Sequence, residues 1–380
     1  MADLADESPQ NDNSVASKAC TRDNMEACAA ALSKIEDGSE TWEELALIKS
    51  MAPRASCIIP ASSHDFVSSS LLAVGACALL IDDEDDIEPT LSNSIGIVLD
   101  VGAPKDLLYA FMEKFVPETQ PVVVVVTGAG TNERKLKLAM NLLEKCSPAV
   151  VCGRRQDLVA LAEVFNEKQS LSHDGDSDID EDEDTSLSGS AAKERSKSYP
   201  YLKTRKVRRS PSPHRKTRDF KRDLERRVTP LPTTLMKGRF REGTFHNYDI
   251  VETIKQGQRL AVQVNCTVMF QDINLLTNGE LIVDINTCQI GMQNIHSTVE
   301  CLAALTAVVM GIVDEKGEEC TIYKCAHAAC MYYTAGELAI EKATVKDSAL
   351  PGSLRTYFVD ILHTLEEEQI RKEAKLSVHK

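Results

Sequence analysis

The sequence predicts an α/β fold with a mostly parallel central sheet, interrupted by a long disordered insert. Short apolar runs alternate with windows of helical periodicity, which is typical of βαβ units. The run 122–126 is apolar on both faces, as expected for a central strand of a parallel sheet. Residues 168–228 break this pattern, because they contain almost no periodic apolar residues.

The elements before the insert follow in regular alternation. A helical pattern covers 24–49, where Thr41 is a suitable cap for the apolar face that follows. Strands are expected at 57–59, 78–81, 96–101, 122–127 and 149–152. Helices are expected at 67–72, 104–115, 133–145 and 156–167.

Order is expected to resume after the insert. Strands are predicted at 260–264, 268–270 and 281–285, with Asn278-Gly279 as a hairpin turn. Three helices, 298–313, 320–343 and 353–370, close the chain. We therefore expect one domain in two halves, 23–167 and 229–372, with a disordered tail at 1–22, the insert at 168–228 and a short tail at 373–380.

Composition narrows the classes of function. The 380 residues carry a net charge of −15, so the folded body should repel nucleic acid. No apolar run reaches the length of about 20 residues that a membrane span needs. The polar N-terminal segment lacks the apolar core of a secretion signal, and the 12 cysteines are then expected to be reduced thiols. These features favour a protein of the cytoplasm or the nucleus, without a membrane partner.

The insert contains two opposed charge blocks. Residues 174–184 hold eight acids and no bases, and Ser177 within them resembles an acidophilic kinase site. Residues 193–227 hold fifteen Lys or Arg against four Asp or Glu, which is compatible with a nucleic-acid or import-receptor partner. Ser210 and Ser212 precede prolines and resemble proline-directed sites. The alternative is that the two blocks pair loosely within one solvated loop.

Two further patterns allow more than one interpretation. Gly128-Ala129-Gly130 after a strand is compatible with a phosphate cradle, but a plain strand-to-helix turn is the simpler interpretation. Cys320, Cys325, His327 and Cys330 lack the spacing of metal ligands, so buried structural thiols are favoured over a metal site.

Several segments together resemble the hydroxyethylthiazole kinase family of the ribokinase-like superfamily. They occur in the same order as in the family, and the two closing helices contain similar sequence motifs. The matching segments are 71–76 (LLAVGA), 99–102 (LDVG), 127–130 (TGAG), 147–157 (SPAVVCGRRQD), 335–343 (AGELAIEKA) and 351–362 (PGSLRTYFVDIL). The resemblance implies a three-layer ribokinase-like fold and a homotrimer. It also implies transfer of a phosphoryl group from ATP, with Mg²⁺, to a thiazole alcohol.

The resemblance fails at the loop that carries the family's chemistry. The family reads GTGC there, and its backbone N–H groups stabilise the developing charge. This chain reads Ser297-Thr298-Val299-Glu300, so both glycines are lost and Glu300 replaces the cysteine, with Cys301 one position later. A carboxylate suits a helix N-terminus but places negative charge where a phosphate should arrive.

Other family positions are also changed. By resemblance, Leu80 and Val299 are candidate substrate contacts, while Cys152, Asn265 and Thr298 are candidate ATP contacts. Asp157 is the candidate Mg²⁺ ligand, and Glu300 and Cys301 are the catalytic candidates. Because phosphoryl transfer depends on positioning and charge neutralisation, these changes predict weak or absent catalysis and a binding or assembly role. The alternatives are an active thiazole kinase with rearranged site residues, and a nuclear or RNA-associated adaptor acting through the basic arm.

Overall fold

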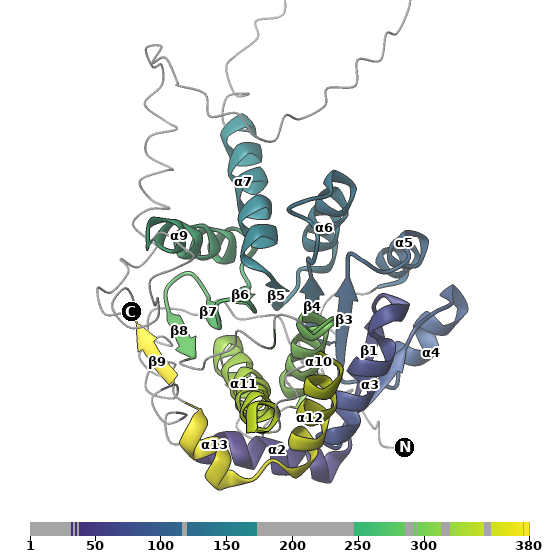
Figure 1. Cartoon of the computed structure of the whole chain (residues 1–380). Helices are drawn as coiled ribbons and strands as arrows, with labels where there is room; N and C mark the ends of the chain where they lie inside the picture. The colour runs from purple at the N-terminus through teal and green to yellow at the C-terminus, as the bar shows by residue number, and fades with distance from the viewer. Residues whose placement is uncertain are drawn as a thin grey trace, which may run out of the picture.

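The computed structural model describes most of the chain on both sides of the insert (Figure 1). The described residues are 32, 35, 38–115, 120–172, 247–285, 292, 295–312, 320–345, 351–374 and 376–379. The three phosphorylation candidates, the basic arm 193–227 and the tail 1–22 lie outside them. Within the described part, no helix is both long enough and apolar enough to span a membrane.

The strands of the described residues form one sheet in the order β2-β1-β3-β4-β5-β6-β7-β8-β9. The six strands from β2 to β6 in that order run parallel, and the last three are antiparallel. Their bounds are β1 Arg54–Ile58, β2 Cys77–Leu80, β3 Gly96–Asp100, β4 Val122–Val125, β5 Val150–Gly153, β6 Thr267–Phe270, β7 Leu275–Thr277, β8 Ile282–Ile285 and β9 Leu376–His379. The mostly parallel sheet predicted from the sequence is confirmed.

Helices cover both faces of this sheet, which gives three layers (Figure 1). One face is covered by α2 Ser39–Met51, α3 His64–Ala73, α10 Thr298–Gly311, α11 Thr321–Val345, α12 Pro351–Thr364 and α13 Glu367–Glu373. The other is covered by α4 Ile87–Leu91, α5 Lys105–Lys114, α6 Glu133–Cys146, α7 Arg155–Ser172 and α9 Asn247–Val264. Neighbouring residues along β4 alternate between the two cores: Val123 and Val125 face one, Val122 and Val124 the other.

The structure corrects several predicted elements. The strand expected at 260–264 is wrong, because this segment is the last part of α9, whose apolar residues Ile250, Ile254 and Ala261 face one core at helical spacing. The single helix expected at 353–370 is two helices, α12 and α13. The tail expected at 373–380 contains β9, which pairs with β8. The short strand β7 was not predicted, and α7 continues to Ser172, inside the expected insert.

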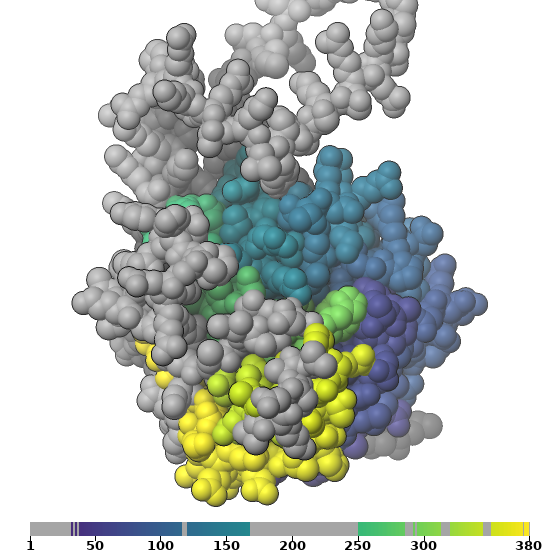
Figure 2. Space-filling view, viewed as in Figure 1, coloured from purple at the N-terminus to yellow at the C-terminus, as the bar shows by residue number. Residues whose placement is uncertain are grey.

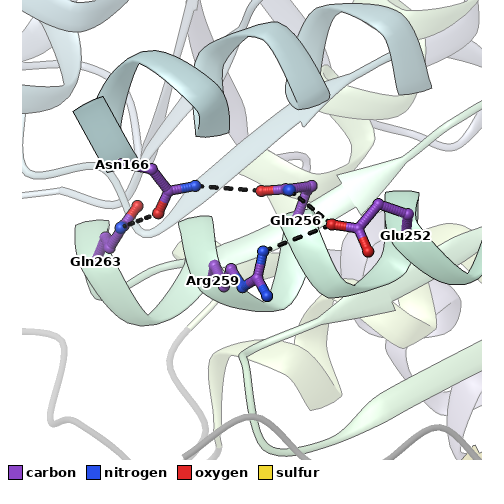
Figure 3. A network of polar contacts seen from close by, with 5 residues as sticks. All are labelled: Asn166, Glu252, Gln256, Arg259 and Gln263. Atoms are coloured by element: carbon purple, nitrogen blue, oxygen red, sulfur yellow. Dashed lines mark hydrogen bonds and ion pairs between the residues drawn. The ribbon is translucent and has the colours of Figure 1, made fainter. Parts of the chain in front are cut away.

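Two helix pairs are joined by polar side chains. Beneath the sheet, Lys324 of α11 and Glu44 of α2 form a buried ion pair with 2.8 Å between Nζ and Oε1. Beside it, Thr41 Oγ1 lies 2.9 Å from His327 Nδ1, and the Tyr323 hydroxyl donates to Glu40. On the opposite face, a more open network joins α7 to α9, the two helices that flank the insert (Figure 3).

The C-terminal helices form a broad part of the outer surface. Residues of α12 and α13, drawn in yellow, lie together at one end of the molecule (Figure 2). Phe358 of α12 is buried against Phe66 of α3, with 5.7 Å between ring centroids. The closing segment that carries the family resemblance therefore belongs to the packed helical layer and not to the polar edge of the sheet.

Candidate functional site

The carboxyl ends of the parallel strands meet the N-terminus of α10 at one edge of the sheet. α10 packs across β1, β3 and β4, so its first turn lies close to the residues that follow these strands. In α/β sheets, this edge is where ligands bind. The residues gathered there are Asp100, Gly102, Thr127, Gly128, Lys135 and Glu300.

Asp100 and Glu300 form a buried pair of carboxyl groups. Asp100 ends β3 and is 1% exposed, and Glu300 in the first turn of α10 is 5% exposed. Asp100 Oδ1 accepts the Gly102 N–H at 2.6 Å, whereas Oδ2 is buried without a hydrogen-bond donor among the described residues. Burial first, and then the neighbouring Glu300 charge, raise the pKa of Asp100 well above its usual range. The site therefore favours the protonated form of Asp100.

Among the residues that the structure describes, Lys135 is the cation that acts on Asp100. It lies in the first turns of α6, and its Nζ donates to the Thr127 carbonyl oxygen at 3.2 Å. A Cβ at Gly128 would lie 3.2 Å from this nitrogen, and a Cβ at Gly102 would lie 3.3 Å from it. Its charge opposes the rise in the Asp100 pKa but is outweighed by burial and by Glu300. The ammonium thus lies between two glycines beside the acid pair.

The Gly128-Ala129-Gly130 segment is a structured turn held by Asp157. Asp157, fully buried in the first turn of α7, accepts the Gly130 N–H on Oδ1 at 2.9 Å. A Cβ at Gly130 would lie 2.5 Å from the Gln156 carbonyl oxygen, which explains the glycine. Asp157 Oδ2 is buried and has no donor among the described residues. The turn interpretation of this segment therefore has a structural cause, which is the hydrogen bond from Gly130 to the buried Asp157 carboxylate.

The altered loop keeps the backbone shape of a glycine loop. Ser297, the N-cap of α10, has a φ of 69°, in the left-handed region that favours glycine. Its hydroxyl donates to Ser63 Oγ at 2.8 Å. Thr298 and Val299 are each 1% exposed, so the first amides of α10 lie beneath packed side chains. Ser297 therefore has a backbone conformation that glycine favours, while the buried Thr298 and Val299 leave no exposed surface for close approach of a phosphate.

The candidate cysteines are buried thiols. Burial raises the pKa of Cys301 to about 12, and burial together with Glu300 and Asp100 raises the pKa of Cys152 further. Both side chains are fully buried, so neither presents a thiolate at neutral pH. Glu300, and not Cys301, is the candidate catalytic residue that lies beside Asp100.

Other predicted site residues are dispersed. Leu80 ends β2 at the same edge of the sheet, next to the end of β1. Asn265 precedes β6, so it lies at the opposite, amino-terminal edge, and is exposed. This distance from the cluster follows from the corrected assignment of 260–264 as helix. Cys325, His327 and Cys330 lie buried within α11, where His327 contacts α2.

The fit of a nucleotide and its metal can be tested on these residues. Two carboxyl groups stand at the N-terminus of α10, where the phosphate should arrive, and the first residues of that helix are buried. No group of three or more His, Cys, Asp or Glu side chains suited to a metal ion occurs in the described part of the chain. Asp157 is the one predicted ligand that keeps a buried acceptor oxygen. The loop residues therefore do not fit the phosphate group of ATP.

Two residues of the cluster were not identified as site residues from the sequence. Asp100 belongs to the 99–102 segment that resembles the family, and Lys135 belongs to none of the matching segments. The signal for Asp100 is an acid directly after a buried apolar strand in a parallel sheet. The signal for Lys135 is weaker, because a lysine in an amphipathic helix is usually solvated.

Comparisons with known proteins were made for the whole chain. No family model matches it. A hydroxyethylthiazole kinase of Zea mays is 20% identical over 342 residues, which cover 90% of this chain and 94% of that protein. A hydroxyethylthiazole kinase of Nitratidesulfovibrio vulgaris is 26% identical over 125 residues, 32% of this chain and 47% of that protein.

The fold also has a solved counterpart. The structure of a hydroxyethylthiazole kinase protein from Pyrococcus horikoshii OT3 matches with a TM-score of 0.59 and 15% identity, covering 90% of this chain and 99% of that chain. The resemblance to the hydroxyethylthiazole kinase family seen in the motifs is therefore confirmed, by similarity along nearly the whole chain and by a shared fold.

Proposed function

We propose that this protein is a hydroxyethylthiazole kinase-like binding or assembly protein with weak or absent phosphotransfer activity. The observation that carries the proposal is the buried Asp100–Glu300 pair at the N-terminus of α10. Two like charges about 4 Å apart repel by about 4 kcal/mol at an effective dielectric constant near 20. An ionised carboxylate at this position therefore opposes an incoming phosphate, where the family's glycine loop would attract it.

The loss of backbone donors acts in the same direction. The first residues of α10 are covered, and Val299 adds a branched side chain where the family has glycine. Removing a single oxyanion donor typically costs about 10²- to 10³-fold in rate. Together, repulsion and lost donors predict a phosphotransfer rate several orders of magnitude below that of a competent kinase.

The direct test is a phosphotransfer assay with the full chain. With Mg²⁺, ATP and hydroxyethylthiazole, we expect no product above the background rate. A triple variant, S297G/V299G/E300C, rebuilds the GTGC loop while keeping Thr298, and it should gain measurable activity. The loop should accept the first glycine without a change of shape, because Ser297 already has a left-handed backbone. S297G alone is the matched control and should stay inactive. Robust turnover by the wild-type chain would refute the proposal.

One observation favours a second candidate, an active kinase with rearranged residues. Glu300 is a carboxylate in the loop where the family has its cysteine, and a carboxylate can accept the proton of an attacking alcohol. In that case, wild-type activity would be present and Glu300→Gln would lose about 10²-fold or more in kcat. Thermal melts with ATP and the thiazole alcohol distinguish the two candidates, since only an active kinase must be stabilised by both.

Two parts of the proposal rest on resemblance or on sequence alone. A homotrimer is proposed from the family resemblance, and its mass can be measured by light scattering. A nuclear or RNA-associated role for 193–227 is proposed from its fifteen basic residues. Deleting that arm should abolish salt-sensitive RNA binding and nuclear import; unchanged localisation and binding would contradict this role.

A further inference from the structure

The hairpin between β7 and β8 contains Asn278-Gly279, a pair at which an asparagine side chain can cyclise readily. The glycine has no side chain to hinder attack by its own backbone nitrogen. The Asn-Gly pair occurs once in the chain. It lies in the hairpin turn expected from the sequence, so a chemical change there acts on two strands of the central sheet (Figure 1).

Cyclisation takes place within the backbone and needs only water to complete it. The Gly279 nitrogen gives up its proton and bonds to Cγ of Asn278, and the side-chain nitrogen leaves as ammonia. Water then opens the succinimide ring, which leaves aspartate or isoaspartate at position 278. The first step needs a free Gly279 N–H and a Cγ that faces this nitrogen.

The folded turn holds both reacting groups in other contacts. The Gly279 N–H donates to the Thr277 hydroxyl oxygen at 3.0 Å, and Gly279 itself is buried. Asn278 Oδ1 accepts the N–H groups of Glu280 and Leu281 at 3.1 and 2.8 Å. The amide side chain is therefore held toward the residues that follow the glycine, while the attacking nitrogen is bonded to Thr277.

Gly279 is also fixed by its contacts with α9. Its φ of 96° lies in the left-handed region, and its carbonyl oxygen accepts the Gln258 side-chain N–H at 3.2 Å. A Cβ at Gly279 would lie 2.4 Å from Val262 Cγ2, so the backbone has little space in which to move. Movement of the nitrogen toward Asn278 therefore requires the turn to open away from α9.

We propose that Asn278 is a gated deamidation site, at which the Thr277 hydroxyl restrains cyclisation while the hairpin is closed. The two N–H donors to Oδ1 would stabilise negative charge that develops on this oxygen, so the bond from Gly279 to Thr277 is the contact that holds the reaction back. Local opening of the turn removes this restraint. Isoaspartate adds one atom to a backbone that has no space for it, so a modified chain should not close the hairpin again.

The first test compares the folded chain with the same sequence unfolded. The full chain and a synthetic peptide of residues 275–283 are incubated in one buffer at pH 8, and deamidation at position 278 is followed by peptide mapping and mass spectrometry. We expect the folded chain to deamidate at least about tenfold more slowly, because only its open turn reacts. Equal rates in the chain and the peptide would overturn the proposal.

Two variants at one position locate the restraint. Thr277→Val keeps the shape of this buried side chain but removes the acceptor, and should raise the rate about two- to tenfold, the effect of one lost hydrogen bond. Thr277→Ser loses a methyl group but keeps the hydroxyl, and is the matched control that should react at close to the wild-type rate. An equal acceleration in both variants would assign the effect to lost stability and refute the role of the hydroxyl. The comparison of chain and peptide decides the gating even if Thr277→Val fails to fold.

Discussion

Two of the sites at which the described residues bury charge are balanced differently. Between α2 and α11, Glu44 and Lys324 form one anion–cation pair at 2.8 Å, with side chains 9% and 6% exposed. At the carboxyl edge of the sheet, two acids share one lysine. The first arrangement is neutral as it stands, while the second needs a proton or a ligand.

The difference separates a structural role from a functional one. A balanced pair needs no further charge and stabilises the position of α2 against α11, together with the neighbouring His327 and Tyr323 contacts. An unbalanced cluster costs stability, which a folded protein tolerates at sites that bind or react. The difference between the two sites can be tested by removing one charge from each and measuring the free energy of unfolding.

The largest effect is expected at the balanced pair. Lys324→Met leaves Glu44 buried without its cation, and breaking a buried pair from one side costs about 3–5 kcal/mol. Chemical denaturation should show this loss in the free energy of unfolding. The double variant K324M/E44L removes both charges and should recover most of the stability. If the single variant lost less than about 1 kcal/mol, the pair would not be the structural element that we infer.

Removing the Asp100 carboxyl group at the unbalanced cluster should raise the free energy of unfolding, whereas removing Lys324 lowers it. The raised pKa of Asp100 means that the folded state holds a proton which the unfolded state loses above about pH 4. Wild-type stability from this group therefore falls as pH rises, by up to about 1.4 kcal/mol per pH unit, until the folded pKa is reached. Asp100→Asn should remove that slope and be the more stable protein at pH 7.

The measurement is denaturant unfolding of both proteins between pH 4 and pH 8. Asp272 also has a pKa raised by burial, but it is present in both proteins and cancels in the comparison. Parallel stability curves for the two proteins would mean that the pKa of Asp100 is not raised in the folded state.

The sequence predicted the frame better than the cluster, for a physical reason. Strands such as 122–126 are specified by local apolar runs, and the six parallel strands were all expected within a few residues. The error at 260–264 arose because a short apolar run is compatible with both the strand period and the helix period. The segment is a helix because it continues α9, which begins at residue 247. The pairing of Asp100 with Glu300 joins residues 200 positions apart, so only the folded sheet edge reveals it.

The smallest effect is expected where polar contacts stay partly hydrated. The α7–α9 network joins Asn166 to Gln256 and Gln263 by hydrogen bonds of 3.2 and 2.7 Å (Figure 3). Arg259 lies 3.5 Å from Glu252, whose side chain is 56% exposed. Arg259→Ala should therefore cost less than about 1 kcal/mol in the free energy of unfolding.

Asn166→Ala is the sharper variant, since it removes two bonds between the helices that flank the insert. It should cost about 1–3 kcal/mol, because each of the two neutral hydrogen bonds contributes about 0.5–1.5 kcal/mol. Denaturant unfolding of both variants measures the difference. A loss as large as that of Lys324→Met would show that a half-hydrated network anchors its helices as firmly as a buried ion pair. Burial and charge balance would then no longer explain the contrast between the two buried charge sites.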